Sequence, residues 1–223
     1  MRAAILPTIL RKPVNFWQIP LFGKLYSLSI LYYRLKGVLL YRLLFKKFGM
    51  RSYIRKPLLI LKPAYISVGD RVSVRDGVRL EVIDSNQERI PELVIEDDTN
   101  IEQNVHIVCH DRIRIGRNVS IAGNCSIVDV THPYLDVHDP MKIGSRILDE
   151  PSFVEIGDGS FIGFGAVILP NIKLGKNVVI GANSVVTRDI PDYCVAAGAP
   201  ARILKRYNFT KKVWESVTTL VST

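Results

Sequence analysis

The chain has 223 residues, 48% of them hydrophobic, and a formal net charge of +9. This length fits one large domain with an appendage better than two equal domains. Thirteen Lys and Arg residues but no Asp or Glu precede Asp70, whereas the remaining residues hold 17 basic and 21 acidic side chains. The excess charge therefore belongs to the N-terminal segment. No zinc-finger spacing and no aromatic-interleaved basic motif accompanies it, which argues against a nucleic-acid partner.

The first 62 residues form a basic, Leu- and Tyr-rich segment that we expect to be helical. Residues 15–48 predict one or two helices, broken near Gly23 and Gly37. The charges spread over much of the helical wheel, so no clean amphipathic face is predicted. Two interpretations stay open: the segment packs on the body of the protein or on a neighbouring subunit, or it makes peripheral contact with an anionic membrane.

Targeting and redox signals point to the cytoplasm. The opening apolar run is short, contains Pro7 and lacks a small-residue cleavage site, and no stretch has the length of a spanning helix. The three cysteines are scattered without a CxxC spacing, which fits a reducing compartment. We expect a cytoplasmic protein. If the N-terminal segment contacts an anionic membrane, the protein would be attached peripherally at its inner face.

An internal repeat of six residues dominates the rest of the chain. Aliphatic side chains recur at Ile156, Ile162, Ile168, Leu174, Ile180 and Val186, and glycine follows four of them at 157, 163, 175 and 181. The same period runs upstream through residues 68–80, 95–107 and, after a two-residue slip, 115–127. A period of six fits neither a helix nor a simple two-sided strand.

This period predicts a triangular prism in which each coil contributes three short strands, one hexapeptide per side. The aliphatic residue points inward, and the small residue lies where the chain turns. We expect about five coils, at 66–82, 93–113, 115–132, 154–171 and 174–191, within a domain spanning 63–202. Two segments leave the prism, at 84–92 and, as a longer arm, at 133–153.

The last part of the chain is predicted to cap the prism. Ala196–Arg202 is rich in turn-forming residues. Residues 203–223, which include Lys205, Arg206 and Trp214, predict a short basic C-terminal helix and a tail.

Several of these motifs resemble those of the hexapeptide-repeat acyltransferases. They are Ile156-Gly-Asp-Gly-Ser-Phe-Ile-Gly163, Gly181-Ala-Asn-Ser-Val-Val-Thr-Arg-Asp-Ile-Pro191 and Ala197-Gly-Ala-Pro-Ala-Arg202. The likeness covers roughly residues 65–206 and is greatest to maltose, galactoside and surface-polysaccharide O-acetyltransferases. It implies a left-handed parallel β-helix, a homotrimer with active sites between neighbouring prisms, and acetyl-CoA as the co-substrate. A single prism has flat faces, so a deep pocket needs a partner, and the arm is suited to reach one.

The resemblance implies that His132, in Thr131-His-Pro133, is the catalytic base. Acetyl transfer to a hydroxyl needs a group that accepts the hydroxyl proton, and a neutral imidazole does so at physiological pH. Acceptor-binding candidates are Asn104, which is placed by the resemblance, and four residues near the base in sequence or about one coil from it. These four are His106, Asp129, Tyr134 and Asp136.

Cofactor-binding candidates lie in the later coils. Gly163, Ala182 and Ser184 are small residues beside which a pantetheine arm would find exposed backbone. Thr187, Arg188 and Arg202 are candidates for phosphate contacts, because guanidinium groups pair with phosphate oxygens. Phe161 stands where the maltose enzymes commonly have tryptophan, which puts the shape of the acetyl end of the pocket in doubt. No metal site is predicted.

The sequence thus predicts an O-acetyltransferase that acts on a sugar hydroxyl, in cell-surface polysaccharide biosynthesis. Direct transfer is favoured over an acyl-enzyme, because no G-x-S-x-G motif is present and Cys125 falls at an inward position. Three alternatives stay open: an N-acetyltransferase on an amino sugar, a zinc carbonic anhydrase on the same fold, and a trimeric scaffold without activity.

Overall fold

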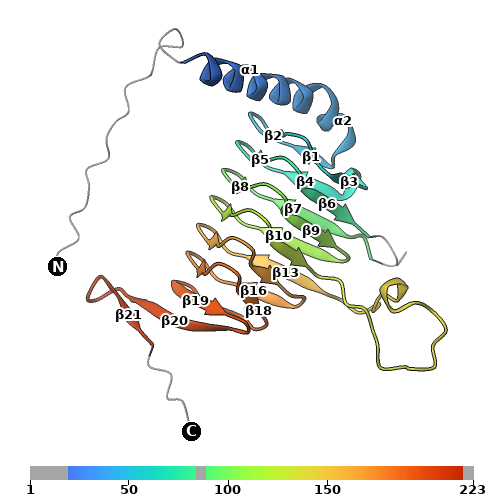
Figure 1. Ribbon diagram of the computed structural model, residues 1–223, viewed down its shortest axis with the longest axis vertical. Coiled ribbons are helices and arrows are strands. Elements are labelled where there is room, and N and C mark those ends of the chain that lie inside the picture. Colours follow the sequence, from blue (N-terminus) through green and yellow to red (C-terminus); the bar gives the residue numbers. More distant parts are fainter. Residues whose placement is uncertain (1–19, 84–88, 218–223) are drawn as a thin grey trace.

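A computed structural model describes residues 20–83 and 89–217, and everything below refers to these residues. They form a parallel β-helix with a helix across its N-terminal end and an antiparallel hairpin at its C-terminal end (Figure 1). The predicted domain type is therefore present. Residues 84–88 of the 84–92 excursion, the first 19 residues and the predicted tail at 218–223 lie outside the described ranges.

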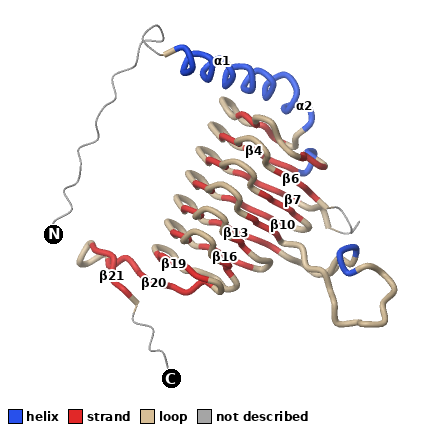
Figure 2. Tube along the Cα trace, viewed as in Figure 1, coloured by secondary structure: helices blue, strands red, loops and turns tan. Residues whose placement is uncertain are grey.

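Six complete coils are present in the described residues, each with one strand in each of three parallel sheets, here called A, B and C. The strands are short and separated by turns along the stack (Figure 2). The first three coils contain β1 (Lys47–Phe48), β2 (Tyr53–Ile54), β3 (Leu59–Leu61), β4 (Ile66–Val68), β5 (Ser73–Val74), β6 (Arg79–Val82), β7 (Glu92–Ile95), β8 (Asn100–Ile101) and β9 (His106–Cys109). The next three contain β10 (Arg112–Ile115), β11 (Ser120–Ile121), β12 (Ser126–Val128), β13 (Phe153–Ile156), β14 (Phe161–Ile162), β15 (Val167–Ile168), β16 (Ile172–Leu174), β17 (Val179–Ile180) and β18 (Val185–Val186).

The period-six aliphatic residues make the core. In sheet A, Ile115 pairs with both Ile95 and Ile156, and all three side chains are buried. Corresponding ladders run through Ile121 in sheet B and Ile127 in sheet C. The predicted inward position is thus confirmed, and stacking the coils buries one continuous apolar column.

In each turn, close approach to the next coil and the left-handed backbone conformation fall on two different residues. One small residue was expected to serve both. Glycine directly after the aliphatic residue is needed for close approach: a Cβ on Gly157 would lie 2.5 Å from the carbonyl carbon of Gly175 in the next coil. The left-handed backbone conformation falls two residues later, often on asparagine. Asn104, Asn118, Asn124, Asn171, Asn177 and Asn183 all have φ between 51° and 60°. Asparagine tolerates this region better than most residues.

The β-helix begins earlier than predicted. Strands β1–β3 form a coil at 47–61, inside the segment assigned to the helical N-terminus, and β1 pairs with β4 in register Phe48↔Val68. The predicted start of the domain at residue 63 is therefore too late by one coil. The predicted number of about five coils is correspondingly one too few.

The N-terminal helix is continuous rather than broken at its glycines. Helix α1 (Leu21–Lys36) passes through Gly23 and continues as a π-helical turn, η2 (Gly37–Tyr41), and a final turn, α2 (Arg42–Leu44). Gly37 is buried, and a Cβ there would lie 2.7 Å from Cε1 of Phe48. The glycine therefore serves close packing on the first coil instead of ending the helix. A 3-10 turn, η3 (Pro63–Tyr65), follows the first coil.

The predicted C-terminal helix is wrong. After β19 (Cys194–Gly198), which pairs with β17, the chain turns back as β20 (Ala201–Asn208) and β21 (Val213–Ser216). Strand β20 pairs antiparallel with β19, and β21 with β20. Edge-to-face contacts of Tyr207 with Phe209 and Trp214 support the hairpin. The unpaired edge of the last coil offers backbone hydrogen bonds that outweigh a weak local helix preference.

Candidate active site

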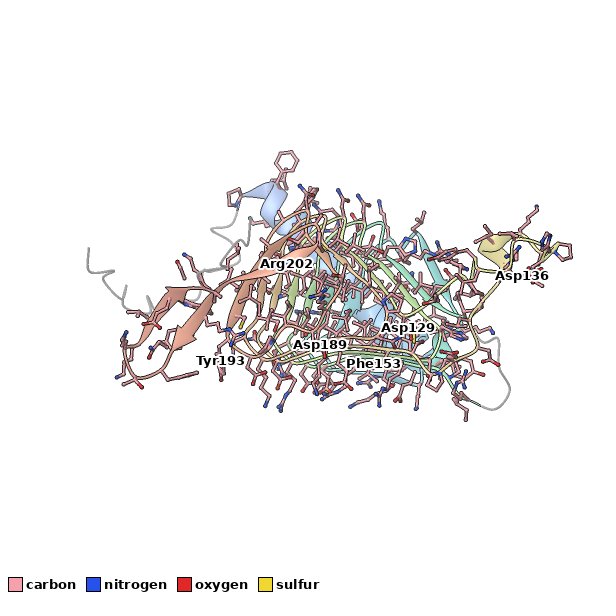
Figure 3. The ribbon with its side chains drawn as sticks, turned by 90° about the horizontal axis from the view of Figure 1, so that it is seen from below. Asp129, Asp136, Phe153, Asp189, Tyr193 and Arg202 are labelled. Carbon is pink, nitrogen blue, oxygen red and sulfur yellow. The ribbon has the colours of Figure 1, made fainter. Side chains whose placement is uncertain are left out.

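The arm (residues 130–152) leaves the prism between β12 and β13 and projects beyond it (Figure 1). It contains one 3-10 turn, η4 (Ile143–Ser145), and is otherwise irregular. Figure 3 places Asp129 at the prism and Asp136 out on the arm. The predicted base, His132, lies near the start of the arm, where the chain departs from the edge between sheets C and A.

A backbone contact fixes the tautomer of His132. Its Nδ1 lies 2.7 Å from the carbonyl oxygen of Arg146. Because a carbonyl oxygen only accepts, Nδ1 must carry the hydrogen and donate it. In the neutral ring Nε2 is then left without a hydrogen, as a proton acceptor on an exposed side chain.

Arg146 also holds the arm together through its side chain, which is 10% exposed. Its guanidinium donates to the carbonyl oxygens of Met141, Asp136 and Asp139 at 2.8, 3.0 and 2.6 Å. It also pairs with the Asp139 carboxylate at 3.1 Å. One residue therefore orients the histidine through its backbone and the surrounding loop through its side chain. No local sequence pattern marks Arg146 as a site residue.

Asp129 is a structural residue. Its carboxylate is buried and accepts hydrogen bonds from the backbone N–H groups of His110, Asp111 (2.9 Å) and Arg112 (2.8 Å). Burial raises the pKa of this carboxyl group, and these backbone hydrogen bonds offset part of the shift. The side chain has no exposed surface with which to hold an acceptor, so that prediction is wrong.

The remaining acceptor candidates are dispersed. Tyr134 and Asp136 are exposed on the arm, and Asp136 accepts from the backbone N–H of His138 at 2.9 Å. Asn104 occupies a left-handed turn position that other asparagines share, which explains its residue type without an acceptor. His106 begins β9 beside Arg79. Burial lowers the pKa of His106 and the nearby Arg79 lowers it further, which favours the neutral ring.

The cofactor candidates divide between two edges of the prism. Gly163 and Ala182 follow strands of sheet B, whereas Thr187 and Arg188 follow a strand of sheet C. Coil packing explains two of the small residues. A Cβ on Gly163 would lie 2.6 Å from the nitrogen of Ala182, and buried Ser184 accepts from the Gly198 N–H at 3.1 Å.

Phe161 lies on a third surface. It projects from β14 in sheet B, is 45% exposed and lines a hollow of about 340 Å³ with Arg75, Ser120 and Ala122. Within one subunit this face is separate from the edge where His132 leaves the prism.

Residues of the last coil and the hairpin line an open pocket of about 260 Å³, here called the arginine pocket. Arg188 from the turn after β18 and Arg202 from β20 both line it, as predicted partners of one phosphate site would. Arg206, also on β20, lines the same pocket. It was not among the predicted site residues, because this segment was expected to form a helix. Three arginines line this pocket together with Asp189, and arginine side chains are suited to binding an anion.

His132 and Arg188 lie along the same edge of the prism. Each follows the end of a sheet C strand, β12 for His132 and β18 for Arg188, with β15 between those strands. Adjacent strands are about 4.8 Å apart, so the two positions are separated by roughly 10 Å along the stack. An elongated anionic donor lying on this edge would reach from the arginine pocket to the histidine.

Within the described residues, no three His, Cys, Asp or Glu side chains gather in a way that could hold a metal ion. No helix among them is long and apolar enough to cross a membrane.

The fold is that of a known class. Residues 153–188 match the family model described as bacterial transferase hexapeptide (six repeats). A putative lipopolysaccharide biosynthesis O-acetyl transferase, WbbJ, from Escherichia coli K12 is 32% identical over 197 residues, covering 86% of this chain and 96% of the relative. A galactoside O-acetyltransferase from the same organism is 39% identical over 105 residues, 47% of this chain and 49% of the relative.

Similar folds occur in solved structures at lower identity. AntD, an N-acyltransferase from Bacillus cereus in complex with dTDP and 3-hydroxybutyryl-CoA, superposes with a TM-score of 0.61 at 19% identity, covering 76% of this chain and 87% of that one. The hexapeptide-repeat acetyltransferase VCA0836 from Vibrio cholerae has a TM-score of 0.55 at 23% identity, covering 82% and 88%. At these identities the likeness establishes the fold alone.

These matches define a hexapeptide-repeat β-helix protein of the transferase class. The chain belongs to the hexapeptide-repeat acyltransferase family, with its left-handed parallel β-helix, and is an acetyltransferase.

Proposed function

We propose that the protein is an acetyl-CoA-dependent O-acetyltransferase that modifies a sugar hydroxyl during cell-surface polysaccharide synthesis, with His132 as the general base. We further propose that it works as a homotrimer in the cytoplasm. The observation that carries the proposal is the 2.7 Å contact of His132 Nδ1 with the Arg146 carbonyl oxygen, which leaves Nε2 as the acceptor. The names of the two curated relatives, both O-acetyltransferases, support the reaction type and the acceptor class.

The chemistry follows from that tautomer. Nε2 of His132 takes the proton of the acceptor hydroxyl while the hydroxyl oxygen attacks the thioester carbonyl carbon. A C–O bond forms, the C–S bond breaks, and the imidazolium returns its proton to the departing sulfur. The Arg146 carbonyl stabilises the ring while it is positively charged, since it accepts from Nδ1–H in both protonation states.

Direct transfer is supported by the state of the thiols. Cys109, Cys125 and Cys194 are all buried, and burial raises the pKa of each. A buried thiol with a raised pKa is a poor nucleophile. No acyl-cysteine step is therefore proposed.

The arginine pocket fits the phosphates of the donor. Arg188, Arg202 and Arg206 come from two different segments and surround a single cavity. The residues present thus suit coenzyme A, whose phosphates would lie in the pocket while its thiol arm follows the prism edge toward His132.

The proposed trimer is supported by apolar side chains that a single subunit leaves exposed on the arm. Tyr134, Leu135 and Val137 on the arm are 69, 85 and 81% exposed, and apolar side chains on a loop held by Arg146 need a partner surface. Phe161 lies on a different face from His132, so the two would meet only if the arm of one subunit reached sheet B of another.

The test measures thiol release from acetyl-CoA with a panel of sugars, nucleotide sugars and glycan fragments. We expect acceptor-dependent release that falls by about two orders of magnitude or more in His132→Ala. The matched control is His138→Ala, an exposed histidine on the same arm, which should retain activity. Equal rates for wild type and His132→Ala would refute the proposal that His132 is the general base. Mapping the acetyl group on the product by NMR separates oxygen from nitrogen transfer, and an N-acetyl product would replace the sugar-hydroxyl proposal.

A further inference from the structure

Tyrosines fix the orientation of α1 on the end of the β-helix. Tyr33 and Tyr41 are buried against the first coil. The Tyr26 hydroxyl accepts from the Arg75 guanidinium at 2.6 Å, and Arg55 lies over the rings of Tyr26 and Tyr33 at 5.6 and 5.8 Å. The inner side of the helix is therefore aromatic, and its rings find their partners within the same subunit.

The opposite side of the helix is a row of leucines. Leu28, Leu31, Leu35 and Leu39 follow one another at intervals of three and four residues and are 53, 53, 52 and 71% exposed. The first three lie in α1 and Leu39 lies in the π-helical turn η2, and we call these four residues together the outer face of α1. Residues at this spacing lie on one side of a helix. The helix is thus apolar on both sides, although only the inner side is covered, and such a helix requires a second apolar contact.

The charge of this helical segment selects the partner, and two of its cations also contact rings, Arg34 over Tyr53 at 6.0 Å and Lys36 over Tyr41 at 5.0 Å. Arg34, Lys36 and Arg42 lie in the same helical segment, and no Asp or Glu occurs anywhere in residues 1–69. A second copy of the helix would bring like charges together. An anionic surface would attract them, and each basic residue near such a membrane contributes roughly a fivefold factor to binding.

We propose that the outer face of α1 docks the protein on an anionic phospholipid bilayer. The helix lies in the membrane interface with its leucines toward the acyl chains and its basic side chains at the headgroups, as interfacial helices do. Because α1 lies across the N-terminal end of the stack (Figure 1), that end faces the bilayer and the C-terminal hairpin lies farthest from it. This inference is independent of the reaction proposed above.

The test is co-sedimentation of the full-length protein with vesicles of phosphatidylcholine alone and with 30 mol% phosphatidylglycerol. We expect binding to the anionic vesicles, at least tenfold weaker binding to neutral ones, and a further decrease when salt is raised. Leu31→Ser/Leu35→Ser should weaken binding to anionic vesicles at least tenfold. Arg34→Gln/Arg42→Gln should weaken it by a similar factor.

The matched control is Leu204→Ser/Val213→Ser, which removes two exposed apolar side chains from the hairpin at the other end of the molecule and should bind as wild type. Circular dichroism checks that each variant is folded. Absence of wild-type binding, equal binding to both vesicle types, or unchanged binding by the leucine variant would each overturn the proposal. A lower oligomer mass for the leucine variant would also overturn it, because the outer face would then contact another subunit.

Discussion

Two elements extend from the β-helix with apolar side chains in solvent, the arm and the helix α1, and they differ in charge and in how they are held. The arm carries both acidic and basic residues, and the side chain of Arg146 holds its backbone together. Helix α1 contains no acidic residue and is held by aromatic rings on one side only. Apolar exposure by itself does not identify a partner. The mixed charge of the arm fits another copy of the same chain, and the uniform positive charge of α1 fits an anionic surface.

The largest expected effect comes from the arm. Leu135→Asp/Val137→Asp places charges where a neighbouring subunit is proposed to pack, so the trimer should dissociate and thiol release should fall at least 100-fold. Light scattering and the acetyl-transfer assay measure the two quantities. Leu31→Ser/Leu35→Ser on α1 is the control and should leave both unchanged with a water-soluble acceptor. If Leu135→Asp/Val137→Asp were a fully active monomer, the proposal that the arm packs on a neighbouring subunit to complete the site would be wrong.

A smaller effect is expected at Arg146, which positions the histidine. In Arg146→Ala the arm loses three backbone hydrogen bonds, so kcat should fall about tenfold while KM for acetyl-CoA stays within twofold. The ring nitrogen shifts of His132 report the cause directly: the Nδ1–H tautomer should predominate in wild type and lose population in the variant. Arg146→Lys, which keeps only the charge, should not restore it. An unchanged tautomer would assign Arg146 a purely structural role.

The smallest expected effect lies in the arginine pocket, which belongs to neither region. Arg206→Ala removes one charge-assisted contact to a phosphate, so KM for acetyl-CoA should rise about tenfold with kcat unchanged. The variant should also discriminate less against 3′-dephospho-acetyl-CoA. Lys205→Ala on the same strand is the control. A change in kcat without a change in KM would contradict donor binding at this pocket.

The sequence predicted the prism well because its period is a direct consequence of one inward side chain per hexapeptide. The first coil was missed although Phe48, Ile54 and Ile60 continue the same period. Its inward positions start with an aromatic residue inside a basic, Leu-rich segment, and the glycine after Phe48 is not repeated after the other two. The composition of the leader therefore favoured a helix.

The candidate site was predicted in part. The Thr-His-Pro motif indicated His132, but no local pattern indicates that a residue 14 positions later supplies the carbonyl that orients it. Arg206 was hidden for another reason, since its position depends on an antiparallel strand pairing that local propensity does not encode. Asn104 and Ser184 illustrate a further difficulty: a repeat that needs asparagine and small residues in its turns places such residues at many positions, so residue type alone does not distinguish a turn residue from a site residue.

The close approach allowed by Gly37 has a consequence for how long the stack can grow. A solenoid end exposes unpaired strands that are a ready template for another solenoid end. At one end α1 packs against β2, and the turn η2 packs against β1, where only a hydrogen atom of Gly37 faces Phe48. At the other end the hairpin strand β20 pairs with β19. Sheet B is thereby covered at one end and continued as an antiparallel hairpin at the other, so at neither end does this sheet present the parallel edge by which successive coils pair.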